Sequence, residues 1–421
     1  MKVKINRKTL LEALEKGSVA AISEEAQADL STMSLLLKSI RVTVDKDFII
    51  ESSTNLMASK YSIPITEENE IIAEETGSVL IPAKELMTWI KAQSPDSVIN
   101  MSLNKFNTPE MIKDSSNEDD AAIKQIGTIK LSSKDTSKIA AKWELDCYDS
   151  EQKKVVDYNK RGTKCFDIRS KVLIETLNKL SFAATKKDFE NITDSISVQI
   201  DGNNVYFLTT DTKRCAVYKM APSSINNVEL KDTLLIPINL LTIASKISDE
   251  ENDLSFFYDK EGDKIFISQK NLEIRVCSVI KETITKFPSI SKLIGTTYKQ
   301  LTTVAKSDMH RVLGNAMLVN GHAASFSFAS NKLTLKAISE GSYKPSVVRT
   351  NVSDLAKELM LVLSPTHLMD VVKVLKSENI QIQIPENLKS VKIIGESDEN
   401  FYYYSMSKRD ARYESLVKDE E

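Results

Sequence analysis

The chain has 421 residues, of which 41% are hydrophobic and 27% are charged, and its formal net charge is −3. This length allows two or three domains of ordinary globular composition, while the net charge excludes a simple, uniformly basic nucleic-acid binder. The apolar runs are far shorter than the roughly 18 residues of a membrane span, and the amino-terminal stretch lacks the apolar core of a signal peptide, so we expect a cytoplasmic protein with no membrane partner.

The first 92 residues contain three predicted elements. Apolar residues with helical spacing over 7–22, RKTLLEALEKGSVAAI, predict an amphipathic helix. Residues 40–51, IRVTVDKDFIIE, alternate with period two around a polar turn, which predicts a β-hairpin with one buried face. Residues 79–92, VLIPAKELMTWIKA, indicate a short strand, a proline and a helix. Proline suits the first turn of a helix because its missing N–H would have no partner there.

Residues 104–127, NKFNTPEMIKDSSNEDDAAIKQIG, are polar, charged and without periodicity. We interpret the middle of this segment as a surface excursion or a disordered loop. Its acidic cluster of Glu118, Asp119 and Asp120 is far more typical of a solvated loop than of a metal site.

The same three elements then return twice. A second helix, hairpin and strand–proline–helix stretch occupy 170–185, 195–208 and 234–247, and a third set occupies 306–318, 325–336 and 361–375.

The spacing of these elements indicates a repeat. The last apolar residues before the hairpin turns, Val44, Ile200 and Phe328, lie 156 and 128 residues apart, and the prolines before the helices lie 155 and 128 residues apart. The chain therefore reads as three copies of a unit of about 128 residues, with about 28 extra residues in the first copy. Helices on one face of antiparallel sheets predict an α+β fold, with domains at 1–160, 161–294 and 295–421.

Catalytic signals are weak throughout the sequence. The four cysteines have no metal-binding or redox spacing, and the three histidines have no ligand spacing. No glycine-rich phosphate loop or nucleophile elbow occurs. Cys215 lies between apolar neighbours, which favours a thiol in a strand core over a nucleophile. We therefore expect no enzyme activity, no cofactor and no metal.

Three segments in this order resemble the bacterial DNA polymerase III beta subunit family, the sliding clamps. They are LTTDTKRCAVYKM at 208–220, KFPSISKLI at 286–294 and YYYSMSKRD at 402–410. The resemblance covers essentially the whole chain except 104–127 and the tail.

The resemblance implies a processivity factor that forms a head-to-tail homodimer around double-stranded DNA. Such a ring has six domains, with two helices of each domain inside and the sheets outside. At about 10 Å per helix diameter, the six helices of one chain enclose a hole of about 9 Å and twelve helices one of about 28 Å. A duplex whose major groove alone is ~12 Å wide requires the larger hole.

The resemblance also implies three sets of site residues. Basic residues expected to face DNA, each otherwise an ordinary solvated side chain, are Lys84, Lys91, Arg169, Lys171, Lys186, Lys187, Arg311, Lys373 and Lys376. A pocket for peptides of the polymerase and the clamp loader would use Thr210, Lys213, Arg214, Cys215, Pro288, Leu293, Tyr404, Met406 and Arg409. The dimer interface, unless these residues are internal core, would use Trp143, Leu145, Met317 and Leu318.

This sequence departs from the family pattern at several positions. Thr212 stands where the family has glycine, Cys215 where it has leucine and Ser407 where it has proline, and Lys213 stands where histidine is common. The loop SEEAQADLST after the first helix is acidic where the family often has an arginine. The tail, 410–421, extends past the usual end and reads as a disordered acidic end rather than a cover for the pocket.

Two other functions remain open from the sequence. A repeat-built, β-rich scaffold that binds only proteins would need no basic helical face, so the charges of the helices separate it from a clamp. An enzyme without a familiar motif would instead show buried titratable residues in a cleft.

Overall fold

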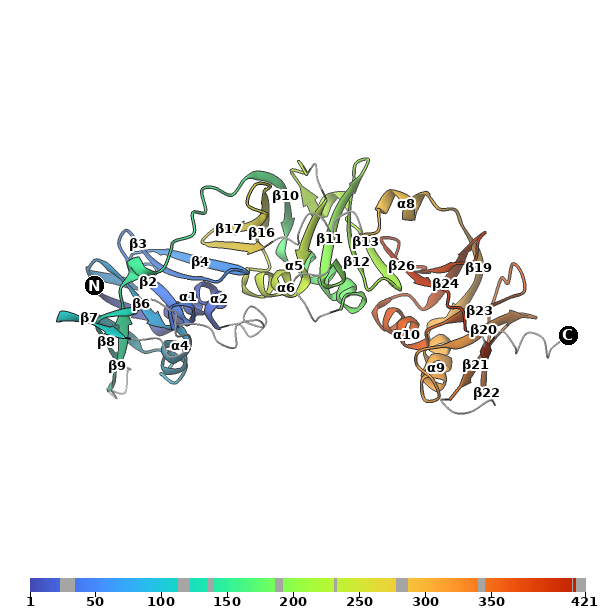
Figure 1. The fold of residues 1–421 in the computed structure, drawn as a ribbon, viewed down its shortest axis with the longest axis horizontal. Helices are drawn as coiled ribbons and strands as arrows, with labels where there is room; N and C mark the ends of the chain where they lie inside the picture. The colour runs from blue at the N-terminus through green and yellow to red at the C-terminus, as the bar shows by residue number, and fades with distance from the viewer. Residues whose placement is uncertain are drawn as a thin grey trace. The chain divides into compact units, whose positions relative to one another are not determined.

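A computed structural model describes residues 1–22, 35–112, 122–134, 140–185, 192–230, 233–277, 287–339, 345–410 and 412–413 (Figure 1). Their contacts divide them into two compact units, which we describe separately. Unit 1 comprises Met1–Ile174, Asn226–Glu229 and Asn239–Ser278, and unit 2 comprises Glu175–Ile225, Leu230–Ile238 and Val279–Glu421. The division into domains at 1–160, 161–294 and 295–421 follows the sequence repeat and stays a prediction.

One large antiparallel sheet forms most of unit 1. Its strands follow the order β14 (Ile225–Asn226), β10 (Thr163–Arg169), β16 (Asp253–Asp259), β17 (Lys264–Gln269), β18 (Leu272–Cys277), β4 (Met57–Pro64), β3 (Asp47–Ser53), β2 (Ser39–Val44), β6 (Gly77–Pro82), β9 (Ala140–Tyr148), β8 (Ile123–Lys134), β7 (Val98–Ile112), β1 (Lys2–Asn6) and β5 (Ile71–Glu75). The first predicted hairpin is β2–β3, and β18 joins β4, which is distant in sequence, through antiparallel pairing.

Short helices accompany this sheet. They are α1 (Arg7–Gly17), α2 (Val19–Ile22), α3 (Leu35–Lys38) and α4 (Ala83–Lys91). Helix α1 contacts α4, β3 and β4 and buries Leu10, Ala13 and Leu14. Its last residue, Gly17, is so close to β3 that a Cβ atom there would lie 2.5 Å from the Ile50 carbonyl oxygen. The apolar stripe of the sequence therefore faces the sheet, as its spacing predicts.

The two ends of the segment 104–127 lie in strands, and its middle, residues 113–121, where a surface excursion or disordered loop is expected, lies outside the described residues. Strand β7 ends at Ile112, and β8 begins at Ile123. The two strands pair antiparallel along most of their length, with an irregular register between Lys105 and Glu110. The side chains of Ile112 and Ile123 pack in one cluster with Leu35, Leu36, Leu80 and Tyr148. Long-range packing at this end of the hairpin supplies the order that the local sequence does not indicate. The acidic cluster Glu118, Asp119 and Asp120 lies outside the described residues.

Unit 2 contains two antiparallel sheets. The larger has the order β15 (Leu234–Pro237), β11 (Ser195–Asp201), β12 (Asn204–Thr210), β13 (Arg214–Lys219), β26 (Phe401–Met406), β25 (Ser390–Gly395), β24 (Asn379–Pro385) and β19 (Tyr298–Ala305). The smaller has the order β22 (Pro345–Asn351), β21 (Lys332–Ile338), β20 (Ala324–Ala329) and β23 (Leu359–Leu363). The second and third predicted hairpins are β11–β12 and β20–β21.

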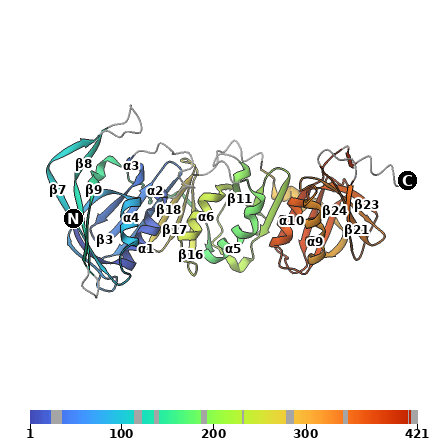
Figure 2. The same ribbon diagram turned by 90° about the horizontal axis from the view of Figure 1, so that it is seen from below.

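The remaining helices complete the repeat. They are α5 (Ser170–Leu180), α6 (Ile238–Ile247), α8 (Ile290–Gly295), α9 (Lys306–Met317) and α10 (Pro365–Val374). Helices α9 and α10 lie side by side in Figures 1 and 2 and contact each other, and α9 also contacts β21 and β22.

Every predicted hairpin and helix of the repeat is present, which confirms the α+β prediction. The role of the prolines needs a correction at two of three positions. Pro82 and Pro237 end strands β6 and β15, and only Pro365 begins its helix.

The start of the tail is anchored to unit 2. Tyr413 is fully buried against Ala323, Ile338 and Val362. Its hydroxyl donates to the Ala323 carbonyl at 2.8 Å and accepts from the Ile338 N–H at 3.1 Å. The expectation of a disordered acidic end is therefore wrong for residues 412 and 413, and residues 414–421 lie outside the described ones. No helix among the described residues is long and apolar enough to cross a membrane.

Candidate functional site

The predicted peptide pocket lies on one face of the larger sheet of unit 2. Strands β13 and β26 are neighbours, and their register places Cys215 opposite Tyr404. Because side chains alternate across a strand, Cys215 and Tyr404 point to one face and Arg214 points to the other. The two sequence segments that suggested the pocket are therefore adjacent in the fold.

Aromatic and aliphatic side chains fill the floor of this region. Cys215 and Tyr404 are buried in a cluster with Tyr206, Leu208, Val217, Leu235, Phe287 and Ile290, against which Leu293, Tyr298 and Tyr402 pack. Burial raises the pKa of the Cys215 thiol to about 12, so this thiol is neutral and inert at pH 7. The interpretation of Cys215 as a core thiol agrees with this environment.

A buried amide fixes the segment that carries Pro288. The Gln199 side chain donates to the Pro288 carbonyl at 2.9 Å and accepts from the Ile290 N–H at 2.8 Å. These two hydrogen bonds hold the start of α8 on β11, and Leu293 of α8 packs against the cluster.

Arg214 belongs to a different environment from the rest of the predicted pocket. Its guanidinium donates to Asp211 at 2.8 Å, to Asp370 of α10 at 2.7 Å and to the Phe182 carbonyl at 2.7 Å. Burial and the nearby Arg214 lower the pKa of His367 to about 4, so His367 is neutral at physiological pH. The structure thus places Arg214 in an internal ion network that ties β13 to α10.

The rim of the pocket is exposed and basic. Lys213, Met406 and Arg409 are exposed, and Met406 donates its backbone N–H to the Lys213 carbonyl at 2.9 Å. Thr210 lies below them, with its hydroxyl hydrogen-bonded to the Arg214 carbonyl at 2.6 Å. Thr212, at the position of the family's glycine, has a φ of 74°, in the left-handed region that favours glycine.

Sequence reasoning missed the residues beside this pocket. The Lys392 ammonium lies 4.5 Å from the ring centroid of Tyr402, 5.8 Å from that of Tyr298 and 5.9 Å from that of Tyr404. Desolvation by burial lowers the pKa of Lys392. The run YYYSM indicates an aromatic surface in the sequence. No sequence pattern indicates that Lys392, on the neighbouring strand β25, lies against these rings.

The residues predicted to face DNA are exposed wherever the structure describes them. Lys84 and Lys91 lie on α4, Lys171 on α5, Arg311 on α9 and Lys373 on α10. Lys91 lies 3.7 Å from Glu15 and Arg311 lies 3.0 Å from Asp308, so these two cations are partly neutralised.

The other members of that set lie outside helices or outside the described residues. Arg169 is exposed at the end of β10. Lys376 lines a cavity of about 700 Å³ together with Lys306 and His310. Lys186, Lys187 and the acidic loop SEEAQADLST lie outside the described residues.

Two apolar surfaces correspond to the predicted interface. In unit 1, Trp143 is 36% exposed and stacks on Trp89 with 6.3 Å between ring centroids, whereas Leu145 is buried. In unit 2, Leu318 is 86% exposed after the end of α9, and Met317 is half-buried. The structure therefore leaves Trp143 and Leu318 available to a partner and places Leu145 in the core.

Comparisons with known proteins give one consistent family. The family model of the DNA polymerase III beta subunit, central domain, matches residues 167–289. The chain is 22% identical over 413 residues to the beta sliding clamp of Mycoplasma capricolum, which covers 95% of this chain and 97% of the relative.

Solved structures share the fold over nearly the whole chain. The DNA polymerase III subunit beta from Pseudomonas aeruginosa matches with a TM-score of 0.76 at 14% identity, covering 97% of this chain and 100% of that one. The beta subunit from Thermotoga maritima matches with a TM-score of 0.73 at 17% identity, covering 97% and 99%. The chain is therefore similar, along nearly its whole length, to the DNA polymerase III beta subunits known as beta sliding clamps, and it shares their fold.

Proposed function

We propose that two copies of this chain close into a ring that encircles duplex DNA, and that the ring tethers a DNA polymerase and a clamp loader through short peptides. Each copy would contribute three clamp domains, and the ring would work in the cytoplasm. A polymerase tethered to a ring stays at a high effective concentration on its template.

The distribution of charge supports this proposal most directly. The whole chain has 56 lysines and arginines against 59 aspartates and glutamates. The six repeat helices reverse this balance, with eleven basic against six acidic side chains. A helical lining that attracts phosphates without reading bases suits a ring that slides along DNA. A scaffold that binds only proteins would not need this sorting.

Two free strand edges support closure by a second copy. Strand β22 is an edge of the smaller sheet in unit 2, and β9 pairs with β6 only between Tyr148 and Leu80 in the described residues. Val347 of β22 is 48% exposed, and Leu318, just after the end of α9, is 86% exposed. Helix α9 contacts β22. Edge strands with apolar side chains are suited to pairing with another chain.

The cluster around Cys215 and Tyr404 supports a peptide-binding role for its surface. The structure of a sliding clamp from Pseudomonas aeruginosa was solved with griselimycin bound. That clamp matches this chain with a TM-score of 0.75 at 13% identity. In this chain the Tyr404 ring is buried with Cys215, so a partner peptide would bind higher on the rim, against Met406 and Leu293. Exposed Lys213 and Arg409 would favour acidic side chains beside the apolar anchor of that peptide.

Retention on circular DNA tests the ring. The protein, loaded on nicked circular DNA with its cognate loader, is expected to remain bound through gel filtration at moderate salt and to leave after the DNA is linearised. Retention that survives linearisation would indicate a groove binder and contradict the proposal. A triple variant with Lys84, Lys171 and Lys373 changed to Gln should load with lower efficiency and a weaker salt dependence, since each phosphate contact adds about one unit to the salt slope.

A further inference from the structure

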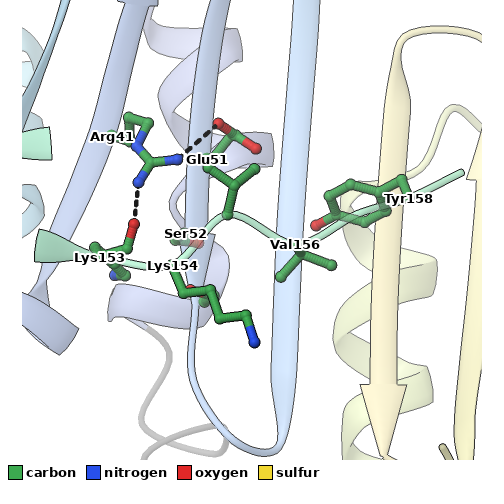
Figure 3. Close-up of a pocket in the computed structure, with 9 residues that line it drawn as sticks. Arg41, Glu51, Ser52, Lys153, Lys154, Val156 and Tyr158 are labelled. Carbon is green, nitrogen blue, oxygen red and sulfur yellow. Dashed lines mark hydrogen bonds and ion pairs between the residues drawn. The ribbon is translucent and has the colours of Figure 1, made fainter. Parts of the chain in front are cut away.

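A layer of buried charged side chains lies in unit 1, beneath the segment that follows the 3₁₀ turn Ser150–Gln152 (Figure 3). Arg41 of β2 is 8% exposed, and Lys153 and Tyr158 of the overlying segment are 8% and 9% exposed. Arginine and lysine are almost never buried to this degree unless they are paired.

Arg41 and Lys153 hold this segment to the sheet reciprocally. The Arg41 guanidinium donates to the carbonyl of Ser150 at 2.7 Å and to the carbonyl of Lys153. The Lys153 ammonium donates to the carbonyls of Leu36 at 3.1 Å and Ser39 at 2.7 Å. These carbonyls are neutral, so these hydrogen bonds do not neutralise the two cations; Arg41 has in addition an ion pair with Glu51.

Several donors in this layer have no acceptor. Within the described part of the chain, Arg41 Nε, Tyr158 Oη and Arg275 Nε are buried without a hydrogen-bond partner. Figure 3 shows the Tyr158 hydroxyl turned toward the cavity that Arg41 also lines. Leaving a buried donor unpaired costs roughly 1–3 kcal/mol, more for charged groups, so Arg41 and Tyr158, which line one cavity, together indicate a place for an acceptor. The buried Glu273 Oε2 also has no hydrogen-bond partner among the described residues.

Among the described residues that line this space, basic side chains outnumber acidic ones. Glu51 is the carboxylate beside Arg41, at a separation of 3.9 Å, and burial raises the pKa of its carboxyl group. Asp157 is the acidic residue that lines the adjoining groove. The basic residues that line it are Lys153, Lys154, Lys264 and Arg275.

The space has two parts that share the segment from Lys153 to Val156. The inner part, lined by Arg41 and Tyr158, has a volume of about 10 Å³, room for about one water molecule. The outer part is a groove of about 820 Å³. An anion in the groove could reach the lysines and Arg275 directly, and a single water would connect it to the inner donors.

We propose that this groove is a binding site for the phosphate group of a small phosphate compound. A phosphate presents several acceptor oxygens and up to two negative charges, which suits a guanidinium and several ammonium groups that converge without a carboxylate for each. The groove is wide enough for a pyrophosphate or a phosphate monoester, and no function is assigned to it by the sliding-clamp fold. The proposal does not depend on ring formation or on the peptide pocket.

Calorimetry on the full-length protein tests this site. Inorganic phosphate and pyrophosphate are titrated separately, with sodium chloride at matched ionic strength as the control for screening. At least one of the two should bind to a single site and raise the melting temperature, whereas chloride should not.

Variants assign the binding to the groove. Arg275→Gln should weaken it by roughly tenfold or more, since it removes a charge-assisted hydrogen bond. Lys154→Gln, at an exposed residue, serves the same purpose if Arg275→Gln unfolds the protein. Lys105→Gln, at an exposed lysine of β7 away from the groove, should leave binding unchanged.

Three outcomes would overturn the proposal. They are no binding of either compound at millimolar concentration, equal binding by the wild type and both groove variants, and binding of an oligonucleotide with none of the small compounds. The comparison between phosphate and pyrophosphate also distinguishes a site for one phosphate group from a site for two.

Discussion

Lys153 is the most unusual single residue of the structure because its ammonium is buried and has no carboxylate partner among the described residues. Burial, with a further contribution from Arg41, lowers the pKa of Lys153 from 10.5 to about 8. The folded state therefore releases this proton at a lower pH than the unfolded state does. Below about pH 8 both states bind the proton, and the full cost of burying the charge is present.

This difference predicts a measurable pH dependence. Between about pH 8 and 10.5 the unfolded chain binds one more proton than the folded chain, so the contribution of Lys153 to stability rises with pH by roughly 3 kcal/mol. Urea unfolding in phosphate-free buffer at pH 7, 8, 9 and 10 measures the free energy of unfolding of the wild type and of Lys153→Met. The difference between the two proteins should rise with pH in favour of the wild type. Parallel pH profiles for the two proteins would show that Lys153 titrates normally.

Among the elements, the long β7–β8 hairpin distinguishes this chain, because it contains the extra residues of the first copy. Its far end is fastened at two places. Ile123 is 1% exposed in the cluster with Leu80 and Tyr148, and Lys124 makes an ion pair with Asp149 at 2.7 Å. The hairpin thereby braces the start of the segment that covers Arg41.

A matched pair of substitutions tests this role of the hairpin. Ile123→Ala should lower the free energy of unfolding of unit 1 by about 2–5 kcal/mol, because it leaves a cavity in a buried cluster. Met111→Ala, in the same hairpin but 62% exposed, should change it by less than about 0.5 kcal/mol. Similar small effects of both substitutions in chemical denaturation would show that the hairpin end is not packed.

For the whole molecule, the proposed ring depends on apolar side chains that a single chain leaves exposed. Leu318 is 86% exposed and Trp143 is 36% exposed. Aromatic and aliphatic anchors of this kind commonly contribute most of the binding energy of an interface. In the proposed dimer these two side chains would be buried.

Light scattering at micromolar concentration tests this interface. Trp143→Ala and Leu318→Ser should each shift the protein from dimer toward monomer, with a loss of about 1–2 kcal/mol of association energy or more. Ile72→Ser, at another exposed apolar residue (55%) outside the predicted interface, should leave the mass unchanged. A dimer mass for both interface variants would contradict the assignment of Trp143 and Leu318.

Much of the fold was predictable because its signals are local and repeated. The alternation in IRVTVDKDFIIE specifies a hairpin with one buried face, and the structure contains it as β2–β3. The same pattern also contained the polar residues at Arg41 and Glu51, but no local rule indicates that Arg41 would be buried. Strand parity separates the side chain of Arg214 from that of Cys215, which the resemblance groups in one pocket, and this grouping stays a prediction.

The sequence by itself determined the repeat, the antiparallel α+β architecture and the surplus of basic residues on the helices, because periodicity and charge are properties of neighbouring residues. Only the tertiary structure decided that the two ends of the extra segment pair as strands, that Tyr413 anchors the start of the tail, and that Arg41, Lys153 and Tyr158 share one buried layer. The last two depend on contacts between residues at least 70 positions apart, such as Tyr413 with Ile338 and Arg41 with Lys153. Such contacts form only when the whole unit packs, so no window of the sequence contains them.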